Sequence, residues 1–117
     1  MHITYLVHGF PPFENAGTEQ HTALLTTEMV SLGHQITIIS ATRRPGSPHG
    51  TVFTESHSSL TIHRVVNNIP ALALNKREQR PEIEQILAQL IPSTTDIVHI
   101  QHTQFLSSNI PTQTPLF

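Results

Sequence analysis

The amino-acid sequence predicts an α/β fold in which helices flank a parallel β-sheet. Apolar runs rich in β-formers recur at 3–7, 35–40 and 97–100, and too few polar residues interrupt them for strands with one face in water. A segment with helical spacing separates the first two runs, and another precedes the third. Strands that alternate with helices in this way pair in parallel through right-handed crossovers.

The first unit, 3–40, has the pattern of a strand, a loop, a helix and a second strand. Its loop at 8–17 lacks periodicity, because two prolines have no N–H donor and two glycines permit tight backbone. We expect the helix to begin at Thr18, whose side chain suits an N-cap, and Gly33 to follow it as the C′ residue. The stripe expected to face the sheet has helical spacing: His21, Leu25, Met29 and Leu32.

The sequence after this unit predicts a loop and two short strands. The loop at 41–50 contains four Pro or Gly residues. Strands at 51–54 and 60–66 follow, joined by a polar turn. In the later strand we expect His63 and Arg64 to have a structural role in the sheet.

A second helix and a last strand complete the predicted elements. The helix is expected from Pro81 to Leu90 or Ile91, where apolar residues recur at helical spacing before Pro92 ends it. The strand at 97–100 ends in polar residues. Alternation along that strand puts His99 and Gln101 on one face and His102 on the other.

The carboxyl ends of the strands are where a ligand is expected in an open α/β sheet. The loop at 8–17 lies at that edge, and the following helix directs its free N–H groups and positive dipole there. Gly17 at the junction lets a phosphate or sugar oxygen approach the backbone closely. Arg43 and Arg44, which follow the second strand, are either ligand cations or solvated loop charges. The sequence therefore predicts an anion or polar-ligand site.

Composition narrows the classes of function. The chain has 117 residues, a formal net charge of −2 and no cysteine, which fits one small domain without disulfides or thiolate metal ligands. A net charge of this sign gives no indication of a basic surface that would bind nucleic acid. The residues before the first strand do not resemble a signal peptide, so no secretory signal is expected, and no apolar run approaches the roughly 20 residues that span a bilayer. We expect a cytoplasmic location, with the inner membrane face as an alternative.

Three other kinds of site fit the sequence poorly. The nine histidines are scattered over loops and strands and include no helical pair of the H-E-x-x-H type, so no metal site is expected. No G-x-S-x-G elbow is present for a nucleophilic serine. Dinucleotide binding needs a G-x-G-x-x-G turn and an acidic residue at the end of the second strand, and the sequence has neither.

Several segments resemble the start of a retaining GT-B glycosyltransferase of the family-4 group. They are I-T-Y-L-V-H-G-F-P-P at 3–12, A-G-T-E at 16–19, L-G-H-Q-I-T-I at 32–38, I-H-R-V at 62–65, D-I-V-H-I-Q-H at 96–102 and L-S at 106–107. The corresponding family patterns are a GFPP loop, a G-x-E helix start, GHEVTV, V-x-V-H-R-V, DVVH-x-H and a later LS. The chain departs from them with Ala16 in place of a glycine and with Gln101 in place of the second histidine of H-x-H.

The resemblance implies a Rossmann-like, incomplete N-terminal half of a GT-B fold. Residues 1–108 would form the acceptor-side domain, 109–117 an irregular tail, and the C-terminal donor domain would be absent. The full-length relative would transfer a sugar from a nucleotide-sugar to an acceptor with retention of configuration, and this chain alone would be inactive. It would then be a fragment, a truncated gene product or a split subunit.

The resemblance also implies roles for individual residues. His102 would contact the transferred sugar and is the catalytic candidate, whereas His99 is expected to be a core histidine. Gly17 and Thr18 would bind the donor phosphate. The acceptor-side loop would contribute Phe10, Pro11, Glu14 and Asn15, with Gln101 and Arg43 as weaker candidates.

The expected partners follow from these roles. They are a nucleotide-sugar donor, a glycan, lipid or small-molecule acceptor, and a separate C-terminal domain, with no nucleic acid, metal or cofactor. The alternative function is that of a non-catalytic remnant or interaction module, whose exposed sheet edge would pair with a partner strand.

Overall fold

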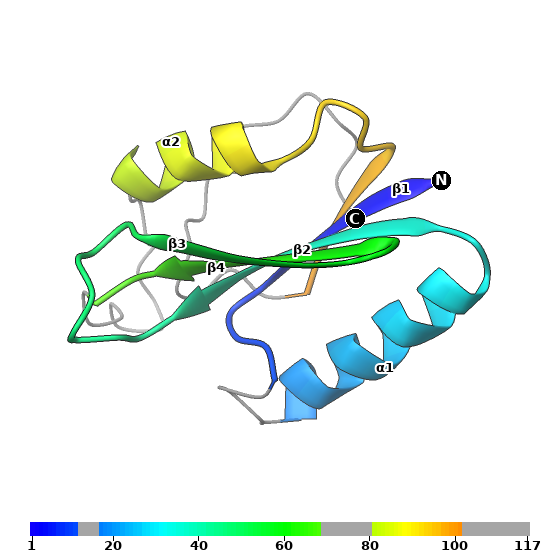
Figure 1. Cartoon of the computed structure of the whole chain (residues 1–117), viewed down its shortest axis with the longest axis horizontal. Helices are drawn as coiled ribbons and strands as arrows, with labels where there is room; N and C mark the ends of the chain where they lie inside the picture. The colour runs from blue at the N-terminus through cyan, green and yellow to red at the C-terminus, as the bar shows by residue number, and fades with distance from the viewer. Residues whose placement is uncertain (12–16, 69–80, 102–117) are drawn as a thin grey trace.

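One five-stranded sheet organises the chain, with a helix on each of its faces (Figure 1). The computed structural model describes residues 1–11, 17–68 and 81–101. In chain order the elements are β1 (His2–Val7), α1 (Gly17–Ser31), β2 (Gln35–Thr42), β3 (Val52–His57), β4 (Leu60–Val66), α2 (Pro81–Leu90) and β5 (Ile97–Ile100). The predicted α/β class is confirmed.

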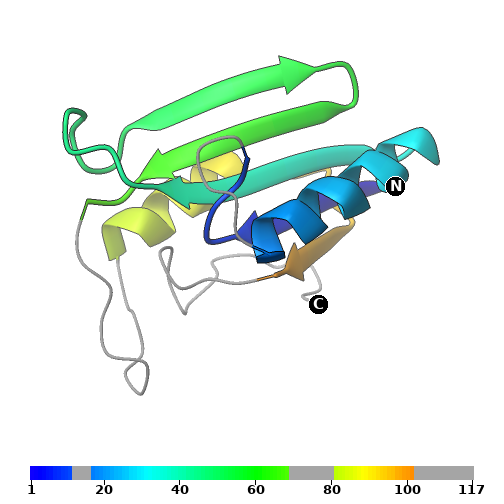
Figure 2. The same cartoon turned by 90° about the horizontal axis from the view of Figure 1, so that it is seen from below.

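The strand β1 lies near the centre of the sheet, whose order is β3-β4-β2-β1-β5. It pairs in parallel with β2 on one side and with β5 on the other. All six of its residues are buried, as expected for a parallel strand covered on both faces. Figure 2 shows β5 beside β1, and the hairpin of β3 and β4 at the opposite side of the sheet.

The sheet is mixed rather than wholly parallel. β4 is parallel to β2, but β3 is antiparallel to β4 and forms the outer strand. The polar segment 55–59, predicted as a turn, belongs mostly to these strands, and only Ser58 and Ser59 form the turn. The polar composition of 55–57 predicted the end of the strand too early. An outer strand keeps one side in solvent and therefore tolerates polar side chains.

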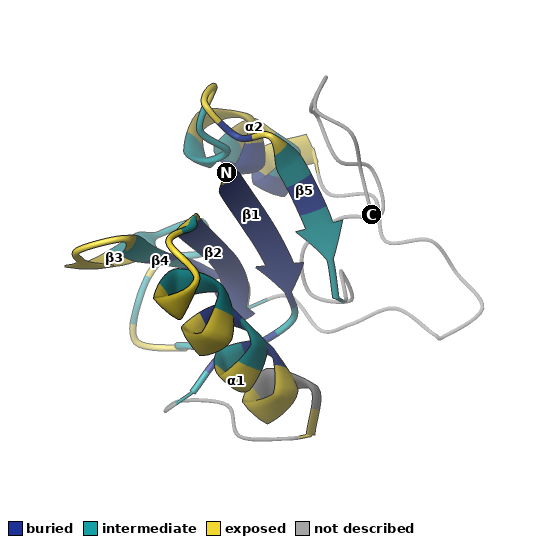
Figure 3. Ribbon diagram, turned by 90° about the vertical axis from the view of Figure 1, so that its right-hand side faces the viewer, coloured by how far each residue is buried: buried dark blue, intermediate teal, exposed yellow. Residues whose placement is uncertain are grey.

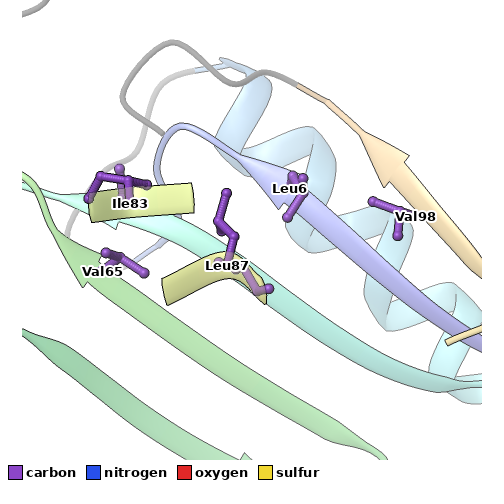
Figure 4. Close-up of a cluster of buried hydrophobic side chains, with 7 residues drawn as sticks. Leu6, Val65, Ile83, Leu87 and Val98 are labelled. Carbon is purple, nitrogen blue, oxygen red and sulfur yellow. The ribbon is translucent and has the colours of Figure 1, made fainter. Parts of the chain in front are cut away.

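Two apolar cores lie on opposite faces of the sheet. Under α2, Ile83 and Leu87 pack against Leu6, Val65 and Val98 (Figure 4). The core on the α1 face contains side chains from β1, the loop after β1, β2 and β4: Ile3, Tyr5, Val7, Phe10, Ile36, Ile38 and Ile62. Each helix therefore covers one face of the sheet, and both cores contain side chains of β1, β2 and β4.

The face of α1 that meets the sheet differs from the predicted stripe. Leu25 and Met29 do pack against the core, but His21 is exposed and Leu32, beyond the helix end, is 70% exposed. Two threonines, Thr22 and Thr26, are buried instead. The yellow outer side of α1 is visible in Figure 3.

The burial of Thr26 is compatible with an apolar interface because the helix satisfies its hydroxyl. Thr26 Oγ1 donates to the carbonyl oxygen of Thr22 at 2.9 Å, which removes the cost of burying an unpaired hydroxyl. Leu24, which is 71% exposed, shows why helical spacing did not predict the buried face of α1. Adjacent leucines at 24 and 25 put apolar side chains on two sides of the helix, so the pattern did not define a single face.

The end of α1 is confirmed as predicted. Gly33 has a φ of 91°, and its N–H donates to the Val30 carbonyl at 3.0 Å while the His34 N–H donates to the Met29 carbonyl at 3.1 Å. This pair of hydrogen bonds is the Schellman motif, in which glycine occupies the left-handed position. Among the helices that the structure describes, none has the length and apolar character to cross a bilayer.

Candidate functional site

Three segments leave the sheet at one edge, called here the carboxyl edge. Val7 pairs with Ser40, and Leu6 pairs with Ile100. Because these strands are parallel, the loop after β1, the loop after β2 and the residue after β5 emerge side by side. The described residues that follow β1 and β5, His8 to Pro11 and Gln101, therefore lie at the same edge of the sheet.

Gly17 is the first residue of α1 at this edge. A Cβ atom built on it would meet nothing within 4 Å in the described part of the chain, so from those residues the backbone there is open to a ligand from its side-chain direction. The first N–H groups of a helix have no partner within the helix, and the positive end of the α1 dipole lies here. The predicted contribution of Gly17 to an anion site is therefore sterically possible.

Four of the predicted site groups stay predictions. His102, Glu14 and Asn15 lie outside the described residues. Thr18 lies in the first turn of α1 rather than preceding it, because the helix begins one residue earlier than expected. Its side chain falls outside the described part.

Phe10 and Pro11, predicted for the acceptor side, have different environments. The Phe10 side chain is 6% exposed and packs in the core on the α1 face. The carbonyl oxygen of Pro11 accepts a hydrogen bond at 2.7 Å from Arg64 Nη2. The start of the loop is thus anchored both by an apolar ring and by a charged donor.

Arg64 is the central side chain of this edge that sequence reasoning did not place in the site. It is only 2% exposed on β4, and its Nη1 donates to Glu55 Oε1 on β3. Hydrogen bonds from His57, at 3.2 Å, and from Arg64 lower the pKa of the Glu55 carboxyl. The available signal was an arginine inside the apolar run of β4, since charged side chains are rarely fully buried unless paired.

The loop after β2 is held by one asparagine. Asn68 Oδ1 accepts from the Arg44 N–H at 2.9 Å, and Asn68 Nδ2 donates to the carbonyls of Arg44 and Ser47 at 3.0 and 2.9 Å. The Arg44 guanidinium lies 4.5 Å from the centroid of the Phe53 ring, a cation–π contact. Arg43 is exposed, so of the two loop arginines it is the one whose side chain points into solvent.

The end of β5 matches the predicted alternation. His99 stacks on Tyr5 with ring centroids 5.0 Å apart, and Gln101 Nε2 lies 3.4 Å from His99 Nε2. These contacts confirm that His99 and Gln101 share a face. Gln101 also donates its N–H to the Leu6 carbonyl at 2.8 Å, so it is fixed beside the end of β1.

The described residues offer polar and cationic groups rather than metal ligands. They contain no group of three or more His, Asp or Glu residues that could hold a metal ion. A helix N-terminus, an exposed arginine and a carboxamide at one edge suit a polar or anionic ligand. The chain matches no protein-family model, no curated protein and no solved structure.

Proposed function

We propose that this chain forms the acceptor-side half of a retaining GT-B sugar transferase and acts together with a donor-binding domain. The observation that carries the proposal is the parallel pairing of β1 with both β2 and β5. This pairing brings the start of α1, the loop with Arg43 and the Gln101 end of β5 to one edge. Motifs that resemble family-4 transferases supply each of these segments except the loop with Arg43.

The proposed chemistry uses charge at the helix start. When a sugar leaves its nucleotide, negative charge grows on the departing diphosphate. Backbone N–H groups at Gly17 and the dipole of α1 would stabilise that charge without reorganising during the reaction. Arg43 would add a cation, and His102, one residue beyond Gln101, would contact the transferred sugar.

Gly17→Ala tests the donor role with little risk to the fold. The added methyl meets nothing within 4 Å among the residues that the structure describes, so a loss of activity would come from the ligand side. The assay mixes the full chain with a separately expressed donor-binding domain of a bacterial family-4 enzyme and measures nucleoside diphosphate released from UDP-glucose or GDP-mannose. We expect Gly17→Ala to lower this release about tenfold or more, the scale of one hydrogen bond to a charged group.

Gly46→Ala is the matched control, because a Cβ atom at Gly46 also meets no described residue within 4 Å. It should release diphosphate at the wild-type rate. If the chain adds nothing to the rate of the donor-binding domain alone, the transferase proposal is wrong. A stable complex without turnover would then favour the alternative, an interaction module.

A further inference from the structure

One buried guanidinium joins three parts of the chain beside the proposed site. Arg64 belongs to β4, its Nη1 contacts Glu55 on β3, and its Nη2 donates to the Pro11 carbonyl after β1 at 2.7 Å. The Phe10 ring centroid lies 6.0 Å from the guanidinium carbon. The edge hairpin is thereby connected to the loop that leads into α1.

The chemistry of the loop explains why such a donor is needed. Pro11 and Pro12 bring no N–H groups of their own, so this part of the chain cannot form a regular ladder with the sheet. The Pro11 carbonyl still requires a donor where it is shielded from water. A planar guanidinium can serve this carbonyl and a carboxylate at the same time in fixed directions, which a lysine ammonium cannot do equally well.

Stability alone is a weak explanation for a buried arginine. Replacing a buried ion pair by apolar side chains of similar volume is often neutral or stabilising. The two partners of Arg64 also belong to different elements, one of them an irregular loop. Its contacts therefore constrain where the loop starts more than they strengthen the core.

We infer that Arg64 is a positioning residue that fixes the start of the loop after β1 through the Pro11 carbonyl, with Glu55 holding its guanidinium in orientation. The consequence for acceptor binding rests on the proposed function. Phe10 and Pro11, at the start of this loop, are the described residues expected on the acceptor side. Loosening this anchor should then weaken acceptor binding without removing any group that touches the reacting atoms.

The test compares Arg64→Lys and Glu55→Ala with Thr54→Val. Arg64→Lys keeps the positive charge but loses the planar guanidinium with its several N–H donors. Glu55→Ala, at a half-exposed side chain, leaves Arg64 in place without its carboxylate partner. Thr54→Val is the matched control, because it removes the Thr54–His63 contact of 2.9 Å between the same two strands. ¹⁵N relaxation of the full chain reports the backbone order parameters of Gly9 and Phe10.

We expect Arg64→Lys to lower these order parameters from about 0.85 toward about 0.6, the range from rigid to flexible backbone. Glu55→Ala should give a smaller decrease in the same residues, and Thr54→Val none. Unchanged values in Arg64→Lys, or an equal decrease in Thr54→Val, would overturn the positioning role. If Arg64→Lys does not fold, Glu55→Ala against Thr54→Val decides the question.

The link to function has a separate readout. In the two-domain assay we expect Arg64→Lys to raise the KM for acceptor about tenfold while the KM for the nucleotide-sugar stays unchanged, because the anchored loop faces the acceptor side. A looser loop with an unchanged acceptor KM would overturn this consequence. The relaxation measurement needs no substrate, so it decides the positioning role even where the wild-type pair transfers no sugar.

Discussion

At the residue scale, His2 shows how a titratable side chain is accommodated at the start of β1. It is 7% exposed, and its Nδ1 and Nε2 lie 2.8 Å from the hydroxyl oxygens of Thr94 and Thr37. Burial lowers the pKa of His2 from its ordinary value of 6.5, Asp96 opposes this shift, and the N-terminal amino group adds to it. Burial lowers the pKa of His63 as well.

These shifts predict a loss of stability in mild acid. A group whose pKa is lower in the folded state stabilises the fold fully above its unfolded pKa, and this contribution is lost as the pH falls through the folded value. Urea unfolding at about pH 7.5 and about pH 5.5 should therefore give a lower free energy of unfolding in acid, and His2→Gln should reduce this difference. His21→Gln, at an exposed site on α1, is the control. An equal pH dependence in His2→Gln and wild type would contradict the role of His2.

Ser40 offers a second test at this scale. Its side chain is fully buried near the end of β2, and its Oγ has no hydrogen-bond partner among the described residues. Ser40→Ala should raise the free energy of unfolding by about 1 kcal/mol, because an unsatisfied buried hydroxyl costs about 1–3 kcal/mol. Thr37 lies on the same strand as Ser40, and Thr37→Val removes its hydrogen bond to His2. This change should lower the free energy of unfolding by about 1 kcal/mol. Destabilisation by Ser40→Ala, measured by urea unfolding, would refute this account of Ser40.

At the element scale, the end of α1 depends on one backbone conformation. Gly33→Ala should lower the free energy of unfolding by about 1–2 kcal/mol, because an L-residue is strained at a left-handed φ. Gly46→Ala should leave stability unchanged or raise it by up to about 1 kcal/mol, since alanine restricts the unfolded chain. Neither added Cβ would meet an atom of the described residues within 4 Å, and Gly46 lacks the positive φ of Gly33. Equal effects in thermal unfolding would exclude the left-handed cap as the cause.

The elements also show which sequence signals are enough to predict a helix end, a buried helix face or a strand boundary. Gly33 was predicted correctly because a C′ glycine is a local requirement of one turn. The buried face of α1 was not predicted correctly. Leucines at 24 and 25 give the helix two apolar sides, and the burial of Thr22 and Thr26 depends on how the sheet packs against the helix. The extent of β3 was missed because the polar residues of an outer strand have the composition of a turn.

At the scale of the whole molecule, the order of the parallel strands brings the loops after β1 and β2 and the residue Gln101 to one edge of the sheet. The sequence predicted the strands and the loop positions from apolar runs and breakers alone. It did not predict the contact between Arg64 and Pro11, because these residues lie 53 positions apart. A tertiary contact between a buried charge and a loop carbonyl has no local signature beyond the charge itself.

The central claim is that the carboxyl edge binds a nucleotide-sugar at the start of α1. The most direct measurement is a titration of the ¹⁵N-labelled full chain with UDP-glucose and with GDP-mannose. One helix start and one exposed arginine offer few contacts, so we expect about millimolar affinity, equivalent to roughly −4 kcal/mol, with amide shifts concentrated at Gly9, Gly17 and Gln101. Shifts concentrated at the opposite edge, around His2 and Asp96, or no shifts with either probe, would contradict the claim.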